Sequence, residues 1–306
     1  MMKKGFRELP VLPGNWTAAA LPEDLPHGDM PGDRIVVGED HIRKAQSLFP
    51  KLLEALREAE GAKAVVSVFG GSGVGKSEIA SLLVWYLRSV GVGSYVISGD
   101  NYPRRIPLYN DAERLSIFRA AGLRGLLAEG VYSAAVQKEL DILWPDGWDA
   151  EPGKAEARPW LGVYQAAGRK ALEAYLGTEK EQDYEELNAI LAAFRRGDGF
   201  IWLKRMGRTE EERWYDPVDF SEVSVLILEW THGGNPALRG IDIPIFLNST
   251  PEETREHRRK RARDGKTDSA FTTMVLEIEQ EELRRAAPSA SFILSKSGQF
   301  LRSEDV

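Results

Sequence analysis

Eight residues from Gly70 to Ser77 have the types and the spacing of a phosphate-binding loop. They read GGSGVGKS and fit the pattern G-x-x-x-x-G-K-[ST] in full, between an apolar run and a helical pattern. Glycines let backbone N–H groups converge on one point, the lysine reaches the β- and γ-phosphates, and the serine hydroxyl can hold Mg²⁺. The residues predicted to bind the nucleotide are Gly71, Ser72, Gly73, Val74, Gly75, Lys76 and Ser77.

Two acidic residues stand at the ends of two further predicted strands. "SYVISGD" ends at Asp100, and "VSVLILEW" carries Glu229 next to its end. Ligands of open α/β sheets bind at the carboxyl ends of the strands, so both side chains belong at the edge where the loop lies. Asp100 could accept the proton of an attacking hydroxyl, and Glu229 could hold a water bound to Mg²⁺. Taken singly, each also fits an ordinary strand-end residue.

A strongly basic segment, "ETREHRRKRARDGKTD", follows a later predicted strand. Phosphoryl transfer spreads negative charge over the equatorial oxygens, and arginines placed nearby stabilise that charge. We predict a helical lid here, with Arg259 and Arg263 as the arginines that close over the transferring group. For at least half of the arginines in this segment, a solvated charged face or a basic patch for nucleic acid is the favoured interpretation.

Strands that alternate with helices indicate how these residues are positioned. The pattern predicts an α/β fold of the P-loop NTPase type, a doubly wound parallel sheet flanked by helices, with a helical lid and an insertion. We expect an arm and a helix over residues 1–61 and a kinase-like domain over 62–306, with the insertion at 106–178. The arm at 1–38 is rich in Pro and Gly, and wrapping around the core fits it as well as disorder.

The composition limits the classes of function. The chain has 306 residues, no cysteine and a formal net charge of −7. Disulfides, zinc ribbons and thiol nucleophiles are excluded, and bulk charge does not favour nucleic acid. Without a secretory signal or an apolar run long enough for a membrane span, we expect a soluble cytoplasmic protein whose partner is a small-molecule acceptor. A homodimer is left open.

Residues 62–296, apart from the insertion, resemble the uridine kinase / phosphoribulokinase family of P-loop kinases. "VFGGSGVGKSEIA" is similar to that family's phosphate loop, "VISGDNY" to its second-strand motif and "VSVLILEWTHG" to the strand that ends in its glutamate. The resemblance implies that Asp100 is the catalytic base, with Tyr102 beside it, and that Glu229 serves the metal. Trp230 stands where the family usually has glycine.

The segment "DYEELNAILAAFRRGDGFIWLKRMGRTEEE" resembles the acceptor side of the same family. The resemblance implies that Asp183 and Arg208 face the acceptor, together with Asp100 and Tyr102. The family's nucleoside-binding pattern is not preserved at 202–209.

These observations favour an ATP-dependent kinase, with ATP and Mg²⁺ as cofactors, that transfers the γ-phosphate to a hydroxyl of a small metabolite. Sugars, sugar phosphates, nucleosides and polyols all remain open as acceptors. The alternative is a P-loop NTPase that acts as a regulatory switch without a small-molecule acceptor. The chain has no N-K-x-D motif of the kind that reads guanine, which weighs against a GTPase switch.

Overall fold

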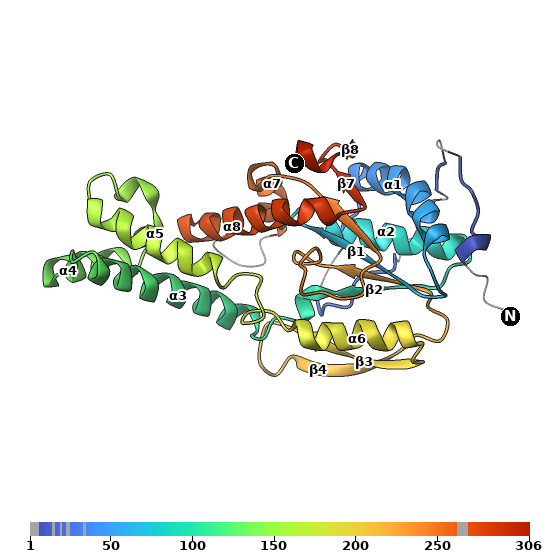
Figure 1. Cartoon of the computed structure of the whole chain (residues 1–306), viewed down its shortest axis with the longest axis horizontal. Helices are drawn as coiled ribbons and strands as arrows, with labels where there is room; N and C mark the ends of the chain where they lie inside the picture. The colour runs from blue at the N-terminus through green and yellow to red at the C-terminus, as the bar shows by residue number, and fades with distance from the viewer. Residues whose placement is uncertain (1–5, 14–15, 19, 23–24, 33–34, 262–268) are drawn as a thin grey trace.

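The computed structural model describes residues 6–13, 16–18, 20–22, 25–32, 35–261 and 269–306, and Figure 1 shows it as a cartoon. Its centre is a six-stranded sheet with the order β2-β5-β1-β6-β7-β8. All neighbouring strands are parallel except β8, which runs antiparallel to β7. This confirms the predicted parallel sheet. The strands are β1 Ala64–Gly70, β2 Ser94–Ser98, β5 Val225–Glu229, β6 Ile243–Leu247, β7 Phe292–Leu294 and β8 Phe300–Leu301.

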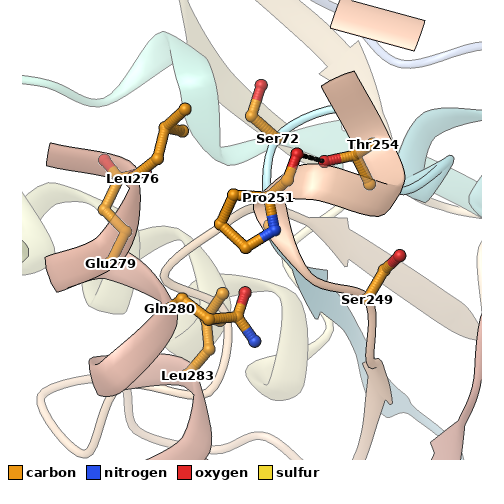
Figure 2. Close-up of a pocket in the computed structure, with 9 residues that line it drawn as sticks. Ser72, Ser249, Pro251, Thr254, Leu276, Glu279, Gln280 and Leu283 are labelled. Atoms are coloured by element: carbon orange, nitrogen blue, oxygen red, sulfur yellow. Dashed lines mark hydrogen bonds between the residues drawn. The ribbon is translucent and has the colours of Figure 1, made fainter. Parts of the chain in front are cut away.

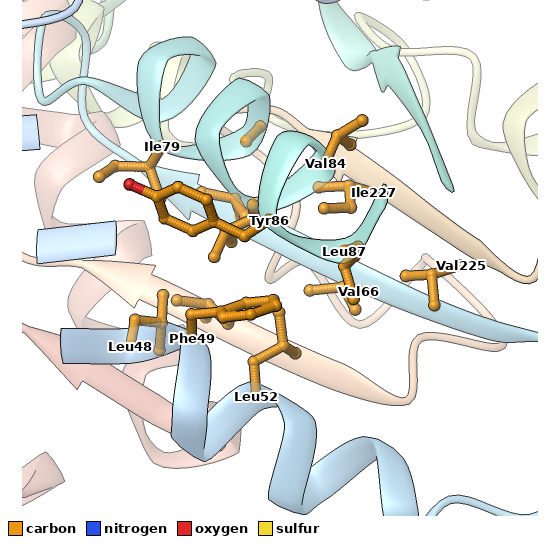
Figure 3. Packing of buried hydrophobic residues seen from close by; sticks show 14 of the residues in the cluster. Leu48, Phe49, Leu52, Val66, Ile79, Val84, Tyr86, Leu87, Val225 and Ile227 are labelled. Carbon is orange, nitrogen blue, oxygen red and sulfur yellow. The ribbon is translucent and has the colours of Figure 1, made fainter. Parts of the chain in front are cut away.

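Helices cover both faces of the sheet because its central strands are apolar on both sides. One face packs against α1 (Glu39–Glu58) and α2 (Lys76–Ser89), and Figure 3 shows Phe49 and Tyr86 from these helices facing Val66 and Ile227 of the strands. The other face packs against α6 (Tyr184–Arg196). Successive residues of a strand point to opposite faces, which is why β1 supplies side chains to both layers.

An antiparallel hairpin lies outside the main sheet, beside α6 (Figure 1). It consists of β3 (Phe200–Met206) and β4 (Arg213–Asp219). The sequence of β3 is "FIWLKRM". Its partner β4 is exposed along most of its length and contains Pro217, so it lacks the apolar pattern by which a buried strand is recognised.

The insertion forms a helical unit that projects from one end of the sheet (Figure 1). It contains α3 (Pro107–Ala128), α4 (Ala134–Leu143) and α5 (Pro159–Glu173). α3 and α5 pack closely because Gly122 and Gly168 leave room for the rings of Tyr164 and Phe118. The same apolar cluster includes Met274, Val275 and Ile278 of α8 (Ala270–Ala286), so α8 joins the insertion to the rest of the molecule.

The described parts of the N-terminal arm pack on the core. For these residues the structure therefore favours wrapping around the core over disorder. The Trp16 ring packs against Phe49 and Tyr86 with centroid distances of 5.0 and 5.2 Å. Leu12, Leu21 and Leu25 pack against the same cluster. The remaining short elements are the 3-10 helices Phe6–Glu8, Gly99–Asn101, Trp148–Ala150, Pro152–Lys154, Ala287–Ser289 and Ser303–Asp305.

Candidate active site

The phosphate loop joins the end of β1 to the start of α2. Gly75 has a φ of 95°, and a side chain there would meet the His41 ring of α1 at 2.8 Å. Lys76, the first residue of α2, donates from Nζ to the carbonyl oxygen of Gly71 at 3.1 Å. The lysine is thus held across the loop, whose N–H groups and helix start favour a bound phosphate.

Glu229 links the phosphate loop to the neighbouring strand β2. Ser77 donates to its Oε2 at 3.2 Å, and Ser98 donates to its Oε1 at 2.6 Å. Ser98 and Glu229 are register partners in the parallel ladder between β2 and β5, so the sheet itself sets this contact. All three side chains are buried. A hydroxyl and a carboxylate are oxygen ligands of the kind that Mg²⁺ prefers.

Asp100 lies in the 3-10 turn directly after β2, exposed at the same sheet edge. The Trp230 indole packs closely against the backbone of this turn at Gly99. A Cβ atom added to Gly99 would lie 2.0 Å from the indole Cγ. Trp230 therefore occupies the space that Gly99 leaves. Gly99 follows Ser98 and Trp230 follows Glu229. Because Ser98 and Glu229 are register partners, Asp100 and Glu229 lie at the same edge of the sheet.

Asp29 of the arm is a residue of this edge that sequence reasoning missed. It accepts hydrogen bonds from the backbone N–H of Ser98 at 2.8 Å, from Asn101 Nδ2 at 3.0 Å and from Arg205 Nη1 at 2.7 Å. Burial raises the pKa of its carboxyl, while Arg205 opposes that rise. Two of its partners flank Asp100, so the arm holds the turn that carries the predicted base.

The structure brings Tyr102 and Asp183 together, because the Asp183 N–H donates to the Tyr102 carbonyl at 2.8 Å. The Tyr102 ring is fully buried, and burial raises the pKa of its hydroxyl. Asp183 caps α6 by accepting from the Glu186 N–H at 3.1 Å and lies 3.5 Å from Arg104. The third predicted acceptor residue, Arg208, is exposed in the turn between β3 and β4.

The predicted lid corresponds in part to α7 (Pro251–Arg261). Arg259 lies in this helix, but its side chain is outside the described part of the structure. Arg263 lies outside the described residues altogether. Their roles stay predictions.

A cluster of charged side chains joins the insertion to α8 and was also missed from sequence. Arg114 of α3 donates to Glu181 at 2.6 Å and lies 3.5 Å from Glu279 of α8. Glu181 is completely buried and also accepts from the Gly177 N–H at 2.7 Å. Arg114 is about 70 positions from Glu181 and 165 positions from Glu279 in the chain, so no local sequence pattern predicts this cluster.

Burial sets the protonation of the neighbouring groups. Desolvation lowers the pKa of His232 to about 4, so its ring is neutral near pH 7. Burial, with the carboxylates of Glu279 and Glu181, raises the pKa of Glu282 to about 8. Burial also raises the pKa of Glu279, against the pull of Arg114.

A small pocket lies between the phosphate loop, α7 and α8 (Figure 2). Glu279 and Gln280 line it from α8, and Gly71 and Ser72 line it from the loop. Gln280 is buried, and its Nε2 has no hydrogen-bond partner among the described residues. The full lining is Gly71, Ser72, Ser249, Pro251, Thr254, Leu276, Glu279, Gln280 and Leu283.

The described residues contain neither a cluster of metal-ligating side chains nor a membrane-spanning helix. Within these ranges, no group of three His, Asp or Glu side chains comes together as a metal site. None of the helices described is long and apolar enough to cross a membrane.

No protein-family model matches the chain. A curated relative, the bifunctional alpha-galactosidase/sucrose kinase of Mediterraneibacter gnavus, is 36% identical over 257 residues. The match covers 84% of this chain and 23% of the relative, so the chain spans less than a quarter of that protein's length.

Two solved structures with low sequence identity also match. A D-glycerate 3-kinase from Cryptococcus neoformans var. grubii is 11% identical with a TM-score of 0.47, covering 87% of this chain and 98% of that one. A possible uridine kinase from Bacillus stearothermophilus is 15% identical with a TM-score of 0.44, covering 82% of this chain and 97% of that one. The curated relative's name includes a sucrose kinase, so this chain is similar to a part of a protein that is named in part as a small-molecule kinase.

Proposed function

We propose that the chain is an ATP-dependent kinase that phosphorylates a hydroxyl group of a sugar. The observation that carries the proposal is the meeting of Ser77, Glu229 and Ser98 at the end of the sheet where Asp100 follows β2. A switch that only binds and hydrolyses a nucleotide has no need of a carboxylate at the acceptor side of that edge.

The phosphate loop would hold the nucleotide by its backbone N–H groups, with Lys76 reaching the β- and γ-phosphates. Ser77 would coordinate Mg²⁺ directly, and Glu229 would do so through water. When bound, the ion would neutralise charge on the phosphates. The buried contact between Ser77 and Glu229 supports this assignment, because it orients both oxygens before any ligand binds.

Asp100 would take the proton of the acceptor hydroxyl as the acceptor oxygen bonds to the γ-phosphorus and the bond to ADP breaks. Its exposed position suits contact with a second substrate. We assign Asp29 the role of holding Ser98 and Asn101, which flank the base. Arg259 and Arg263 remain the proposed lid arginines, and Tyr102, Asp183 and Arg208 the proposed acceptor residues.

A sugar is favoured over the other acceptors because the relative that shares 36% identity is named in part a sucrose kinase. The match covers the kinase-like region and the insertion together, since it extends over 84% of the chain. We also propose that the enzyme is cytoplasmic and that it works as a monomer or a homodimer. Light scattering in solution would determine its oligomeric state.

The test is ADP release from ATP and Mg²⁺ with a panel of acceptors. The panel holds sucrose, glucose, fructose, fructose 6-phosphate, glycerate, glycerol and uridine, with a reaction lacking acceptor and the Lys76→Ala variant as controls. We expect release stimulated by an unphosphorylated sugar and a product heavier by one phosphoryl group. Slow release that no acceptor stimulates would contradict the proposal and favour the regulatory switch.

A further inference from the structure

We propose that Arg114 of the insertion and Glu279 of α8 form a binding site for the hydroxyl groups of an uncharged sugar beside the phosphate loop. The inference rests on the proposed kinase function and names the residues that read the acceptor. It assigns the insertion a part in substrate recognition.

Glu279 is placed between the loop and the insertion. Glu279 is one of the residues that line the pocket, together with Gly71 and Ser72, and Figure 2 shows it on α8. Its Oε1 lies 3.5 Å from Arg114 Nη2. The side chains of Glu279 and Arg114 keep 12% and 15% of their surface exposed, so both are desolvated yet reachable from one side. The charges of Lys76 and Asp100 both act on the Glu279 carboxyl, which puts it near the reacting end of the site.

Two buried amides in this region have hydrogen-bonding capacity that the described residues leave unused. Gln280 Nε2 is such a donor, and its residue lines the pocket beside Glu279. Asn110 Oδ1 is such an acceptor, and its Nδ2 donates to Glu181 at 3.1 Å. Buried polar groups normally find a partner, so a ligand rich in hydroxyl groups would complete them.

The chemistry of the pair suits a hydroxyl ligand. A carboxylate accepts hydrogen bonds from sugar hydroxyls, and a guanidinium donates to sugar oxygens in a fixed fork. Glu181 holds the Arg114 guanidinium from behind at 2.6 Å, so the arginine keeps its orientation without a ligand. Glu181 is therefore a positioning residue, and Glu279 with Arg114 makes the contact.

The balance of charge selects the class of acceptor. Glu181 and Glu279 both pair with Arg114, while His232 beside them is neutral because burial lowers its pKa to about 4. A phosphate group on the acceptor would add negative charge to a cluster whose carboxylates already outnumber its arginine. Such juxtaposition of like charges disfavours binding. The cluster thus favours a neutral sugar over a sugar phosphate.

Steady-state kinetics of Glu279→Gln and Arg114→Lys test the inference. Glu279→Gln removes the charge of one acceptor of sugar hydroxyls, and Arg114→Lys removes the forked donor. We therefore expect the acceptor KM to rise about tenfold or more while the KM for ATP stays within about twofold. Thermal melting of each variant checks that it is folded. If Glu279→Gln does not fold, Arg114→Lys, which keeps the charge and loses the fork, carries the test.

The chain offers a matched control on neighbouring elements. Arg169 of α5 pairs with Glu277 and Glu281 of α8 at 2.8 and 3.1 Å, so it also ties the insertion to α8. Arg169→Met and Glu277→Gln should leave the acceptor KM unchanged. If the control variants raise the acceptor KM as much as Glu279→Gln does, the cluster is only structural and the inference is wrong.

The outcomes separate the two proposals. A wild-type enzyme that phosphorylates sugars, with an acceptor KM indifferent to Glu279→Gln and Arg114→Lys, would overturn the binding site and leave the kinase standing. A wild-type preference for fructose 6-phosphate over fructose would overturn the uncharged class of acceptor. Release of ADP that no acceptor stimulates would overturn the kinase and the site that rests on it.

Discussion

Replacing Asp29 with alanine should destabilise the protein by about 3 kcal/mol, because it breaks a buried ion pair from one side. The carboxylate is 2.7 Å from Arg205 Nη1, and both side chains are almost completely buried. The usual cost of leaving one partner behind is 3–5 kcal/mol. We take the lower end, since Arg205 keeps a second partner, Asp216, at 3.2 Å.

Urea unfolding of wild type and Asp29→Ala at one pH measures the difference in free energy. The control is Asp40→Ala, which removes a pair with Arg43 on the exposed surface of α1. Exposed pairs contribute less than about 1 kcal/mol, so this variant should unfold almost like wild type. We also expect a lower kcat in Asp29→Ala, because Ser98 and Asn101 lose a shared partner on either side of Asp100.

The reasoning is refuted if Asp29→Ala unfolds with a change no larger than that of Asp40→Ala. The arm would then lie on the sheet edge without anchoring it. An unchanged kcat in a variant that is clearly less stable would refute only the positioning role, because the anchor would hold the fold but not the base.

Three further predictions concern other residues of the site. Glu229→Gln should raise the Mg²⁺ concentration needed for half-maximal ADP release by about 10- to 100-fold, because Ser77 loses the carboxylate that orients it; an unchanged Mg²⁺ titration would remove Glu229 from the metal site. Gly99→Ala should lower the melting temperature markedly and reduce kcat, since the new methyl group meets the Trp230 indole at 2.0 Å; a wild-type melting curve would show that the turn yields. The pKa of Glu282 is raised from 4.5 to about 8 in the folded state, so the folded state binds more protons than the unfolded state between these values, and wild-type stability falls as the pH rises through that window. Melting curves of Glu282→Gln from pH 5 to pH 9 should show a smaller fall, and equal slopes for the two proteins would contradict the raised pKa.

The parts of the site that can be predicted from the sequence are those that a short run of neighbouring residues defines. Gly70 to Ser77 form the expected loop, because the motif needs only its own backbone and the helix that follows. Glu229 was identifiable because it ends an apolar run, and parallel strands bring their ends to one edge. The parallel sheet and its flanking helices followed in a similar way from the alternation of strand and helix patterns.

The missed residues depend on contacts between distant segments. Arg114 and Glu279 are 165 positions apart, and each alone has the pattern of an ordinary charged residue on a helix. Asp29 sits in a Pro- and Gly-rich arm that shows no periodicity. Strand β4 forms only because β3 offers it a ladder, since its own residues are mostly exposed. Such features are set by tertiary contact and not by local propensity.

The pairing of Asp29 with Arg205 has a consequence for the order in which the chain assembles. The two residues are 176 positions apart, so the arm leaves the ribosome long before its partner is made. Sequence-distant contacts of this kind form slowly, because a long loop must close before any contact is gained. During synthesis, β2 also cannot pair with β5 until β5 has been made. The turn that carries Asp100 should therefore be among the last parts of the protein to become ordered, and a nascent chain would gain activity only after the whole sheet is complete.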